Sequence, residues 1–470
     1  MMPVPNDIMS FLSSPHPASA GRGLDLRDSL KSDNPAYRKS RPRANVLVCI
    51  LVALLVLLGL REPVSRHYRH VSDRICQRYM AVEKRARRIL THNPLIDGHV
   101  DLAIAIRGLY RNRIDSLEWL ESFKNGTLAG HVDLARLRLG QSGGAFWSVF
   151  APCPAKADDF SDENLAPSVQ FTLDQIDVTN RVLQAFPRDF ALRPDSECAM
   201  KAFKNGRLIS PLGIEGLHQI GNSASNLRLF HGLGVRYATL THNCHNLYAD
   251  AALSERPLSK AKPHWGGVSP HGRKMIHEMN RLGMIVDLAH VSDDTMVDVL
   301  AGKDGWEGSK APVIFSHSSA YSICPHPRNV KDHVLRLVKQ RNSLVLVNVS
   351  PDFISCEDVN DPSGLPKRVE ENATLEQVVK HITYIGNLIG FDHVGLGTDF
   401  DGIQLVPKGF EDVAKYPSLV AALLKAGVSD SDAAKVVGRN LLRIWKEVED
   451  VSAQMRAAGA PVLEDEREVP

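Results

Sequence analysis

Several motifs that would point directly to a function are missing from this chain of 470 residues. None of its seven cysteines forms a CxxC pair, which argues against a structural zinc finger. No GxGxxG follows the first predicted strand, so a dinucleotide-binding fold has no support. Lysines and arginines are dispersed through the chain after about residue 90 and the formal net charge is only +2, which gives no indication of nucleic acid as a partner. No solenoid-type repeat is present.

Long uncharged apolar runs are also scarce, and residues 44–60 form the one that stands out, ANVLVCILVALLVLLGL. Residues 1–43 are rich in Ser, Pro, Arg and Asp, and we predict that they are a disordered tail. The run lacks a polar stripe and is slightly shorter than the roughly 20 residues of a spanning helix. We interpret it as a transmembrane signal anchor, followed by a juxtamembrane linker helix over 61–89. A cleaved signal peptide and a buried helix are the alternatives.

From about residue 90 the chain alternates short apolar runs with amphipathic stretches, a pattern typical of a parallel sheet. The predicted strands are residues 94–99, 144–150, 210–216, 237–242, 284–290, 311–317, 343–349 and 393–400. Eight such strands favour a closed (β/α)8 TIM-like barrel over an open sheet. We assign the barrel domain to residues 90–450 and a C-terminal tail, acidic and rich in small residues, to 451–470.

Side chains typical of metal ligands follow several of these predicted strands. They are His99 and Asp101 in HVD, Glu215 in GIEG, His290 in DLAH and His317 in FSH. Taken singly, each is better explained without a metal, as a buried residue with hydrogen-bond partners or as a solvated side chain. Together they would converge at the carboxyl ends of barrel strands, and three histidines with two carboxylates suit a pair of divalent metals, best of all zinc.

Further polar residues occupy similar positions. His242 ends a predicted strand, Asp399 and Asp401 end another, and Arg328 lies in the loop after His317. A dinuclear hydrolase needs a proton carrier, an electrophile for developing negative charge, and a cation for an anionic end of its substrate.

Ten stretches make the comparison with a known family specific: DGHVDL, GAFWSVFAPC, GIEG, LGVRYATLTHNC, LSERPL, NRLGMIVDLAHVS, FSHSSAYSIC, RNV, ISC and GTDFDG. Over roughly residues 90 to 450 the chain resembles the membrane dipeptidases of renal-dipeptidase type, dinuclear zinc peptidases of the amidohydrolase-like superfamily. The resemblance implies hydrolysis of dipeptides by a hydroxide that bridges two zinc ions.

The resemblance also implies roles for individual residues. His99 and Asp101 would bind one zinc, His290 and His317 the other, and Glu215 would bridge them. His242 would stabilise the tetrahedral intermediate, Arg328 would bind the C-terminal carboxylate of the substrate, and Asp399 would lie near its amine and transfer protons. Phe353 stands where the family has a tyrosine that lines the substrate site.

The family pairs cysteines at positions that match Cys153 with Cys244 and Cys324 with Cys356, which implies an oxidising compartment. The C-terminus lacks the apolar tail of a lipid-anchor signal, so we expect the N-terminal run to anchor the protein as a single-pass membrane protein with a lumenal or extracellular catalytic domain. Of the N-x-S/T sequons, Asn125 and Asn372 are the candidates for glycosylation, because Asn348 lies in a predicted buried strand.

Two other functions stay open from the sequence. The chain could be another hydrolase of the superfamily, such as a lactonase or deaminase, or a catalytically silent membrane protein that keeps the barrel for binding. A non-covalent homodimer is also left open, because no C-terminal cysteine is available to link two subunits.

Overall fold

The computed structural model of the protein describes residues 81–192 and 194–465. The chain divides into two units, Met1–Ser72 and Asp73–Pro470, and all described residues belong to the second. The predicted tail, the apolar run 44–60 and most of the predicted linker lie outside the described residues. Within the described part, no helix combines the length and apolarity needed to cross a membrane.

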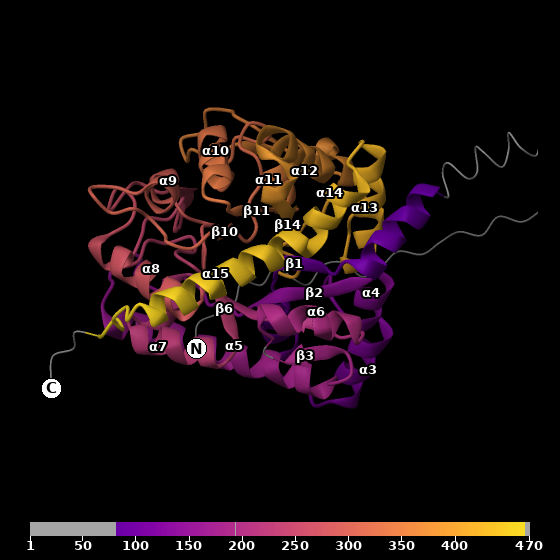
Figure 1. Ribbon diagram of the computed structural model, residues 1–470, viewed down its shortest axis with the longest axis horizontal. Helices are drawn as coiled ribbons and strands as arrows, with labels where there is room; N and C mark the ends of the chain where they lie inside the picture. The colour runs from indigo at the N-terminus through magenta and orange to yellow at the C-terminus, as the bar shows by residue number, and fades with distance from the viewer. Residues whose placement is uncertain (1–80, 193, 466–470) are drawn as a thin grey trace, which may run out of the picture. The chain divides into compact units, whose positions relative to one another are not determined.

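A parallel sheet forms the centre of this unit (Figure 1). Its strands pair in chain order, each parallel to the next: β1 (Leu95–Val100), β2 (Ser142–Ser148), β5 (Leu212–Glu215), β6 (Val235–Thr239), β9 (Ile285–Asp287), β10 (Ile314–Phe315), β11 (Leu344–Val347) and β14 (Val394–Leu396). The first and last strands, β1 and β14, are joined by the residues at their carboxyl ends. Asp101 N donates to Phe400 O at 2.8 Å, and Asp399 N donates to His99 O at 3.0 Å. This arrangement is consistent with the predicted (β/α)8 barrel, and each predicted strand overlaps one of these strands.

Two short strands extend the sheet beside β2, namely β3 (Phe190–Leu192) and β4 (Leu208–Ser210). Gly144 of β2 pairs with Ile209, and a Cβ on Gly144 would lie only 2.1 Å from Ile209 O. Only glycine permits this close approach of the two backbones. Two hairpins lie outside the sheet: β7 (Leu253–Glu255) with β8 (Leu258–Lys260), and β12 (Cys356–Glu357) with β13 (Lys367–Arg368).

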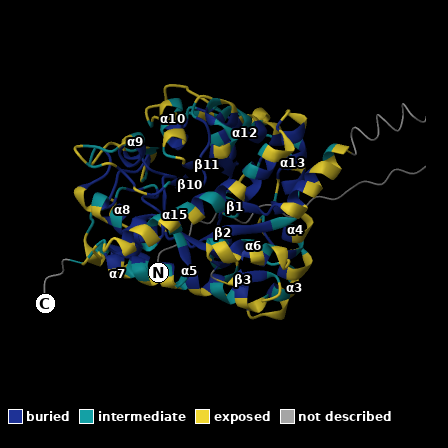
Figure 2. Cartoon of the chain, in the orientation of Figure 1, coloured by how far each residue is buried: buried dark blue, intermediate teal, exposed yellow. Residues whose placement is uncertain are grey.

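Helices surround the strands, with buried inner faces and exposed outer faces (Figure 2). Residues 81–92 are helical, and further α-helices are α2 (Leu102–Tyr110), α3 (Leu117–Asn125), α4 (Leu134–Leu139), α5 (Asp162–Ala185), α6 (Ser196–Lys204), α7 (Ala224–Gly232), α8 (Pro270–Leu282), α9 (Asp293–Ala301), α10 (Asp332–Gln340), α11 (Pro351–Ile354), α12 (Leu375–Ile389), α13 (Tyr416–Lys425), α14 (Asp430–Ala434) and α15 (Asn440–Ala457). The 3₁₀ turns are Leu217–Ile220, Glu370–Asn372, Phe391–His393 and Val413–Lys415, and Lys435–Arg439 forms a π-helical turn.

Local sequence explains where these helices begin and end. In α8, the Ser269 hydroxyl accepts a hydrogen bond from Gly272 N, Pro270 follows at the first helical position, and Gly283 ends the helix with φ of 84°. A capping serine, a proline whose missing N–H costs nothing there, and a left-handed glycine are the residues each position favours.

The helix α15 covers the amino ends of the strands. Its Ile444 and Trp445 pack in one buried cluster with Ile285, Ile314 and Leu344, which begin β9, β10 and β11. The helix continues through Ala457, past the predicted domain end at residue 450, because Ser452 and Met455 remain buried against the barrel. The carboxyl ends of the strands lie at the opposite end of the barrel.

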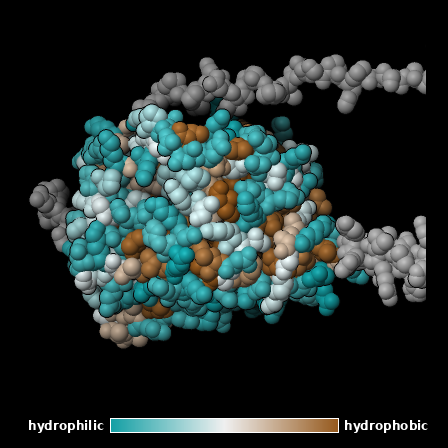
Figure 3. Space-filling model, turned by 90° about the horizontal axis from the view of Figure 1, so that it is seen from above, coloured by the Kyte–Doolittle hydropathy of each residue, from teal (hydrophilic) through white to brown (hydrophobic). Residues whose placement is uncertain are grey.

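The described part of the C-terminal tail packs onto the barrel domain. Asp465 accepts hydrogen bonds from Ala224 N and Ser225 N at the start of α7, and Arg228 donates to Leu463 O. A carboxylate at a helix N-terminus is favourable because it meets unpaired N–H groups and the positive end of the helix dipole. Seen from above, the surface is mostly hydrophilic, with apolar side chains in scattered patches (Figure 3).

Candidate metal centre

The five predicted metal ligands meet at one buried point at the carboxyl ends of the strands. Glu215 Oε1 lies 2.9 Å from His290 Nε2 and 3.4 Å from His317 Nε2, and Glu215 Oε2 lies 3.6 Å from His99 Nε2. His99 Nε2 is in turn 3.0 Å from Asp101 Oδ2. All five residues are at most 6 % exposed. Residues separated by more than two hundred positions are brought together because they stand at the carboxyl ends of four strands of the same sheet, β1, β5, β9 and β10.

The donor set fits two divalent cations sharing one carboxylate. The two oxygens of Glu215 face different partners, one toward His99 and the other toward His290 and His317. Asp101 Oδ1 is buried without a hydrogen-bond partner, so this oxygen is available to a cation. Imidazole and carboxylate ligands at a buried site suit zinc in particular.

The protonation states of Glu215, His290 and His317 also suit metal binding. Burial lowers the pKa of His290 and His317 well below the usual range, which leaves both imidazoles neutral. Burial alone would raise the pKa of Glu215, but His99 and hydrogen bonds from His290 and His317 hold it well below its usual value. A neutral imidazole and an ionised carboxylate are the forms that bind a metal.

Each ligand histidine is oriented by a hydrogen bond on its other ring nitrogen. His99 Nδ1 lies 2.7 Å from the Tyr237 hydroxyl, and His290 Nδ1 lies 2.8 Å from Asn243 Oδ1. His317 Nδ1 lies 2.8 Å from Ser316 Oγ. These contacts direct all three Nε2 atoms toward Glu215, as second-layer partners of metal-binding histidines commonly do. These three partners could not be identified from the sequence, because a buried tyrosine, asparagine or serine carries no distinguishing local pattern.

Asp399 and His242 border the same point. Oxygen and nitrogen atoms of Asp399, His99 and Asp101 lie within 4.8 Å of one another, and Asn348 Nδ2 donates to Asp399 Oδ2 at 3.0 Å. Burial raises the pKa of Asp399 well above its usual value, against the opposing charge of His99, and the neighbouring carboxylates add to this shift. Asp399 is therefore suited to hold a proton.

The structure gives His242 a partner that the sequence analysis did not single out. His242 Nδ1 lies 3.1 Å from Glu255 Oε1 on β7, and the Phe150 ring packs against the imidazole at a centroid distance of 4.9 Å. Atoms of His242, Glu215 and His290 lie within 4.8 Å of one another. The imidazole is thus held beside the ligand cluster from three sides.

Arg328 is the cation predicted to bind the substrate carboxylate. It is only 1 % exposed, and its Nε, Nη1 and Nη2 atoms have no hydrogen-bond partner among the described residues. Burial lowers the pKa of Arg328 to about 10, while the nearby carboxylates of Asp399, Glu215 and Asp287 act in the opposite sense. Its guanidinium carbon lies 5.4 Å from the centre of the Phe353 ring. A buried guanidinium without a counter-ion is costly, which points to an anionic partner.

Both predicted disulfides are confirmed. Cys153 pairs with Cys244 at a Cα–Cα distance of 6.1 Å, and Cys324 pairs with Cys356 at 4.9 Å. Asn329 Nδ2, next to Arg328, donates to Cys324 O and to Phe353 O. The second disulfide and Asn329 therefore hold together the segments that carry Arg328 and Phe353.

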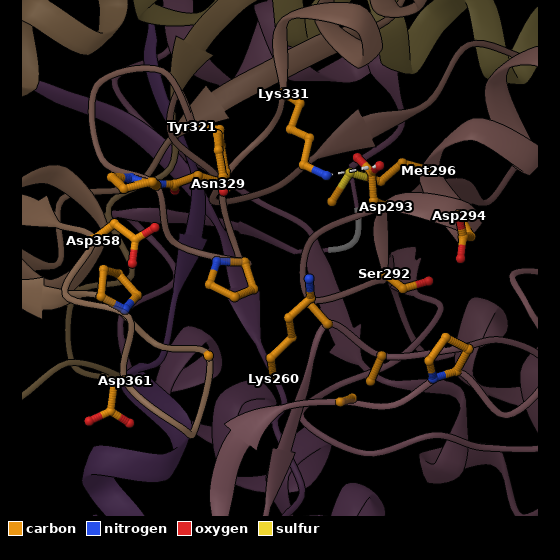
Figure 4. Close-up of a pocket in the computed structure, with 18 of the residues that line it drawn as sticks. Lys260, Ser292, Asp293, Asp294, Met296, Tyr321, Asn329, Lys331, Asp358 and Asp361 are labelled. Carbon is orange, nitrogen blue, oxygen red and sulfur yellow. Dashed lines mark hydrogen bonds and ion pairs between the residues drawn. The ribbon is translucent and has the colours of Figure 1, made fainter.

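A cavity of about 660 Å³ lies against the loops that follow His290 and His317 (Figure 4). Pro327, Asn329 and Ser292 contribute to its wall, and Lys331 points across it to Asp293, with 3.2 Å between Nζ and Oδ2. The side chains that form its described lining include none of the five metal ligands. The cavity is therefore distinct from the metal centre.

The three sequons differ in accessibility. Asn125 and Asn372 are exposed, whereas Asn348 is fully buried and donates to Asp399. A glycan at Asn348 is incompatible with this packing, and the choice of Asn125 and Asn372 stays a prediction.

Comparison with known proteins gives a consistent result. Residues 83–459 match the family model described as membrane dipeptidase, peptidase family M19. The chain is 45% identical over 369 residues to dipeptidase tcpJ of Claviceps purpurea, covering 78% of this chain and 80% of that one. It is 46% identical over 374 residues to an uncharacterised dipeptidase of Schizosaccharomyces pombe, covering 78% and 84% respectively.

Solved structures share the fold. A metallopeptidase of Rhodobacter sphaeroides, liganded with a phosphinate mimic of the dipeptide L-Ala-D-Ala, gives a TM-score of 0.62 at 23% identity and covers 76% of this chain and 99% of that one. The probable dipeptidase PvdM of Pseudomonas aeruginosa gives a TM-score of 0.67 at 21% identity, with coverage of 79% and 99%.

Proposed function

This chain belongs to the membrane dipeptidase family, peptidase family M19, and we propose that it is a dinuclear zinc dipeptidase in which Arg328 binds the C-terminal carboxylate of the substrate. The observation that carries the substrate assignment is the buried guanidinium of Arg328, which has no partner among the described residues. A dipeptide carboxylate supplies the two oxygens that a guanidinium fork matches.

The ligand set supports two zinc ions, with Glu215 between the His99 and Asp101 side and the His290 and His317 side. Two divalent cations, when bound, polarise the scissile carbonyl and make a water molecule nucleophilic near neutral pH. The three histidines take part through Nε2, because their Nδ1 atoms are engaged by Tyr237, Asn243 and Ser316.

The other residues of the site act on the substrate. Arg328 holds the carboxylate and so fixes which peptide bond lies at the reacting point, which limits the enzyme to dipeptides. His242, held by Glu255, faces negative charge that develops on the carbonyl oxygen. Asp399 Oδ2 accepts a hydrogen bond from Asn348, which leaves Oδ1 to carry a proton between the attacking water and the leaving amine.

The cellular setting is part of the same proposal. The two disulfides favour an oxidising compartment, and the uncharged run 44–60 suits a single-pass anchor. We therefore place the catalytic domain on the lumenal or extracellular side, with Asn125 and Asn372 as glycosylation sites. Deleting residues 1–61 should release an active protein from membranes. Partition of the full-length protein into the aqueous phase without detergent would contradict the anchor.

The enzymatic proposal is tested on the full-length protein with metal analysis and peptide hydrolysis. We expect two zinc ions per chain and hydrolysis of Gly–Leu and L-Ala–D-Ala, with the C-terminally amidated forms as poor substrates. Two bound zinc ions without hydrolysis would favour a silent binding protein. Equal hydrolysis of free-acid and amidated dipeptides, or preference for a lactone, would argue against the role of Arg328.

A further inference from the structure

Two buried aspartates outside the ligand set lie directly behind the metal centre. Asp97 is on β1, two residues before His99, and Asp287 ends β9, three residues before His290. Both are 0% exposed. Burying a carboxylate is costly unless hydrogen bonds compensate for the lost water, so the partners of these two side chains indicate what they do.

Asp97 accepts four hydrogen bonds. Its Oδ1 accepts from His99 N at 3.2 Å and from Thr398 N at 2.8 Å. Its Oδ2 accepts from Thr398 Oγ1 at 2.6 Å and from the Tyr416 hydroxyl at 2.7 Å. The carboxylate therefore joins β1, which carries His99, to the segment after β14, which carries Asp399.

Asp287 has the same arrangement on β9, four strands away from β1 around the barrel. Its Oδ1 accepts from Ala289 N at 3.1 Å and from Ser316 N at 2.7 Å. Its Oδ2 accepts from Ser316 Oγ at 2.7 Å and from Thr239 Oγ1. This carboxylate joins β9 to the segment after β10, where His290 and His317 leave their strands.

Both aspartates support backbone that is otherwise unfavourable. His290 has φ of 65° and Asp399 has φ of 66°, in the left-handed region that non-glycine residues seldom adopt. Such conformations persist where surrounding contacts hold them, and they concentrate at functional sites. The hydrogen bonds of Asp287 and Asp97 fix the neighbouring backbone from which these two residues project.

Asp287 also determines which nitrogen of His317 faces the metal centre. Ser316 Oγ donates its only hydrogen to Asp287, so it can only accept from His317 Nδ1, which lies 2.8 Å away. His317 therefore carries its proton on Nδ1 and presents the lone pair of Nε2 toward Glu215. Asp287, Ser316 and His317 form a chain of hydrogen bonds that ends at a ligand atom.

We propose that Asp97 and Asp287 are paired positioning residues, Asp97 for the His99 side of the metal centre and Asp287, acting through Ser316, for the His317 side. Neither touches substrate or metal. The inference rests on the proposed dinuclear function. It predicts that Asp97 affects the affinity of the zinc ion on the His99 side, and that Asp287 affects the affinity of the zinc ion on the His317 side.

The test removes the Ser316 hydroxyl, which connects Asp287 to His317 by hydrogen bonds, and measures metal binding as well as activity. Full-length Ser316→Ala is stripped of metal and titrated with zinc against a chromophoric chelator. We expect one of the two zinc ions to bind about 10- to 100-fold more weakly, the usual effect of losing such a partner, while the other keeps its parental affinity. Ser316→Thr, which retains the hydroxyl, should restore the affinity.

The matched control is Ser452→Ala, since Ser452 is also buried and donates one hydrogen bond, to Arg281 O at 2.6 Å, but lies on α15. It should leave both zinc affinities unchanged and lower the thermal midpoint of the metal-free protein as much as Ser316→Ala does. If Ser316→Ala does not fold, Asp287→Asn provides a second variant that perturbs the same hydrogen bonds. Asp97→Asn should weaken binding of the other zinc ion.

The outcomes separate this inference from the proposed function. Parental affinities for both zinc ions in Ser316→Ala and in Asp287→Asn, or an equal loss at both sites together with a larger fall in midpoint than in the control, would overturn the positioning role alone. A parent protein that binds fewer than two zinc ions would overturn both.

Discussion

Replacing Arg328 with methionine should make the substrate-free protein more stable and the enzyme nearly inactive. Burial lowers the pKa of Arg328 to about 10, which corresponds to roughly 3 kcal/mol against the charged form in the folded state. The pKa is depressed relative to the unfolded chain, so this cost is present in full at neutral pH and is relieved only as the pH rises above about 10. Methionine has a similar length and no charge to bury, so we expect Arg328→Met to gain up to about 3 kcal/mol in the free energy of unfolding.

The same substitution removes the partner of the substrate carboxylate. Truncating one member of a buried charge pair costs about 2 to 5 kcal/mol, so kcat/KM for a free-acid dipeptide should fall at least about 30-fold. The parent should prefer the free acid over the amide, and Arg328→Met should hydrolyse both equally slowly. Arg328→Lys should keep the charge, lose the bidentate geometry and raise KM.

Arg281 provides the control for stability, because it is a buried arginine that does have a partner. It forms two hydrogen bonds with the fully buried Glu278, at 2.6 Å and 2.7 Å. Arg281→Met should therefore destabilise the fold, because it removes both bonds and leaves Arg228 as the remaining charged partner of that carboxylate. Urea unfolding of the three proteins and hydrolysis of matched acid and amide dipeptides give the measurements. Destabilisation by Arg328→Met together with retained acid preference would refute the assigned role.

Three further predictions follow from the site and its surroundings. Glu215→Gln should fold but bind fewer than two zinc ions and lose at least about 100-fold in turnover, because the shared carboxylate is lost; elemental analysis that finds two zinc ions with near-normal turnover would refute this. Reduction of Cys324–Cys356, which closes a loop of 32 residues worth about 3 to 4 kcal/mol in the chain-entropy model, should raise KM before the barrel unfolds; kinetics and circular dichroism at increasing reductant would show the order of the two events. Burial lowers the pKa of His218 and of His381 to about 4, so the unfolded chain binds more protons below about pH 6.5, and each histidine should cost roughly 1.4 kcal/mol of stability per pH unit as the pH falls toward 4. Urea unfolding at pH 7 and pH 5 with equal free energies would contradict this.

Much of the fold could be predicted from the sequence because its signals are local. Each barrel strand is a short apolar run between polar stretches, and a run such as SLVLVNV of residues 343–349 needs no distant partner to be recognised. Chain order then sets the neighbours in a parallel barrel, so the ligands that follow the strands had to meet at one end. The disulfide pairs came from the family resemblance, since spacing alone leaves several pairings open.

The tertiary structure decided the features that depend on contacts between distant segments. No local pattern pairs His242 with Glu255 or joins Asp97 to Thr398, because each of these contacts is fixed only when the backbone around both partners is folded. That Arg328 has no hydrogen-bond partner among the described residues is likewise a property of the folded environment, in which its side chain is buried.

The sequence by itself therefore determined which residue types stand at the strand ends, and hence that a metal centre with zinc-type ligands was to be expected. Only the folded chain decided which ring nitrogen each ligand histidine presents, and that Arg328 is buried without a hydrogen-bond partner among the described residues. The physical reason is that the type of a ligand side chain is a property of one position in the sequence. Its protonation and orientation depend on burial and on hydrogen bonds supplied by other parts of the chain.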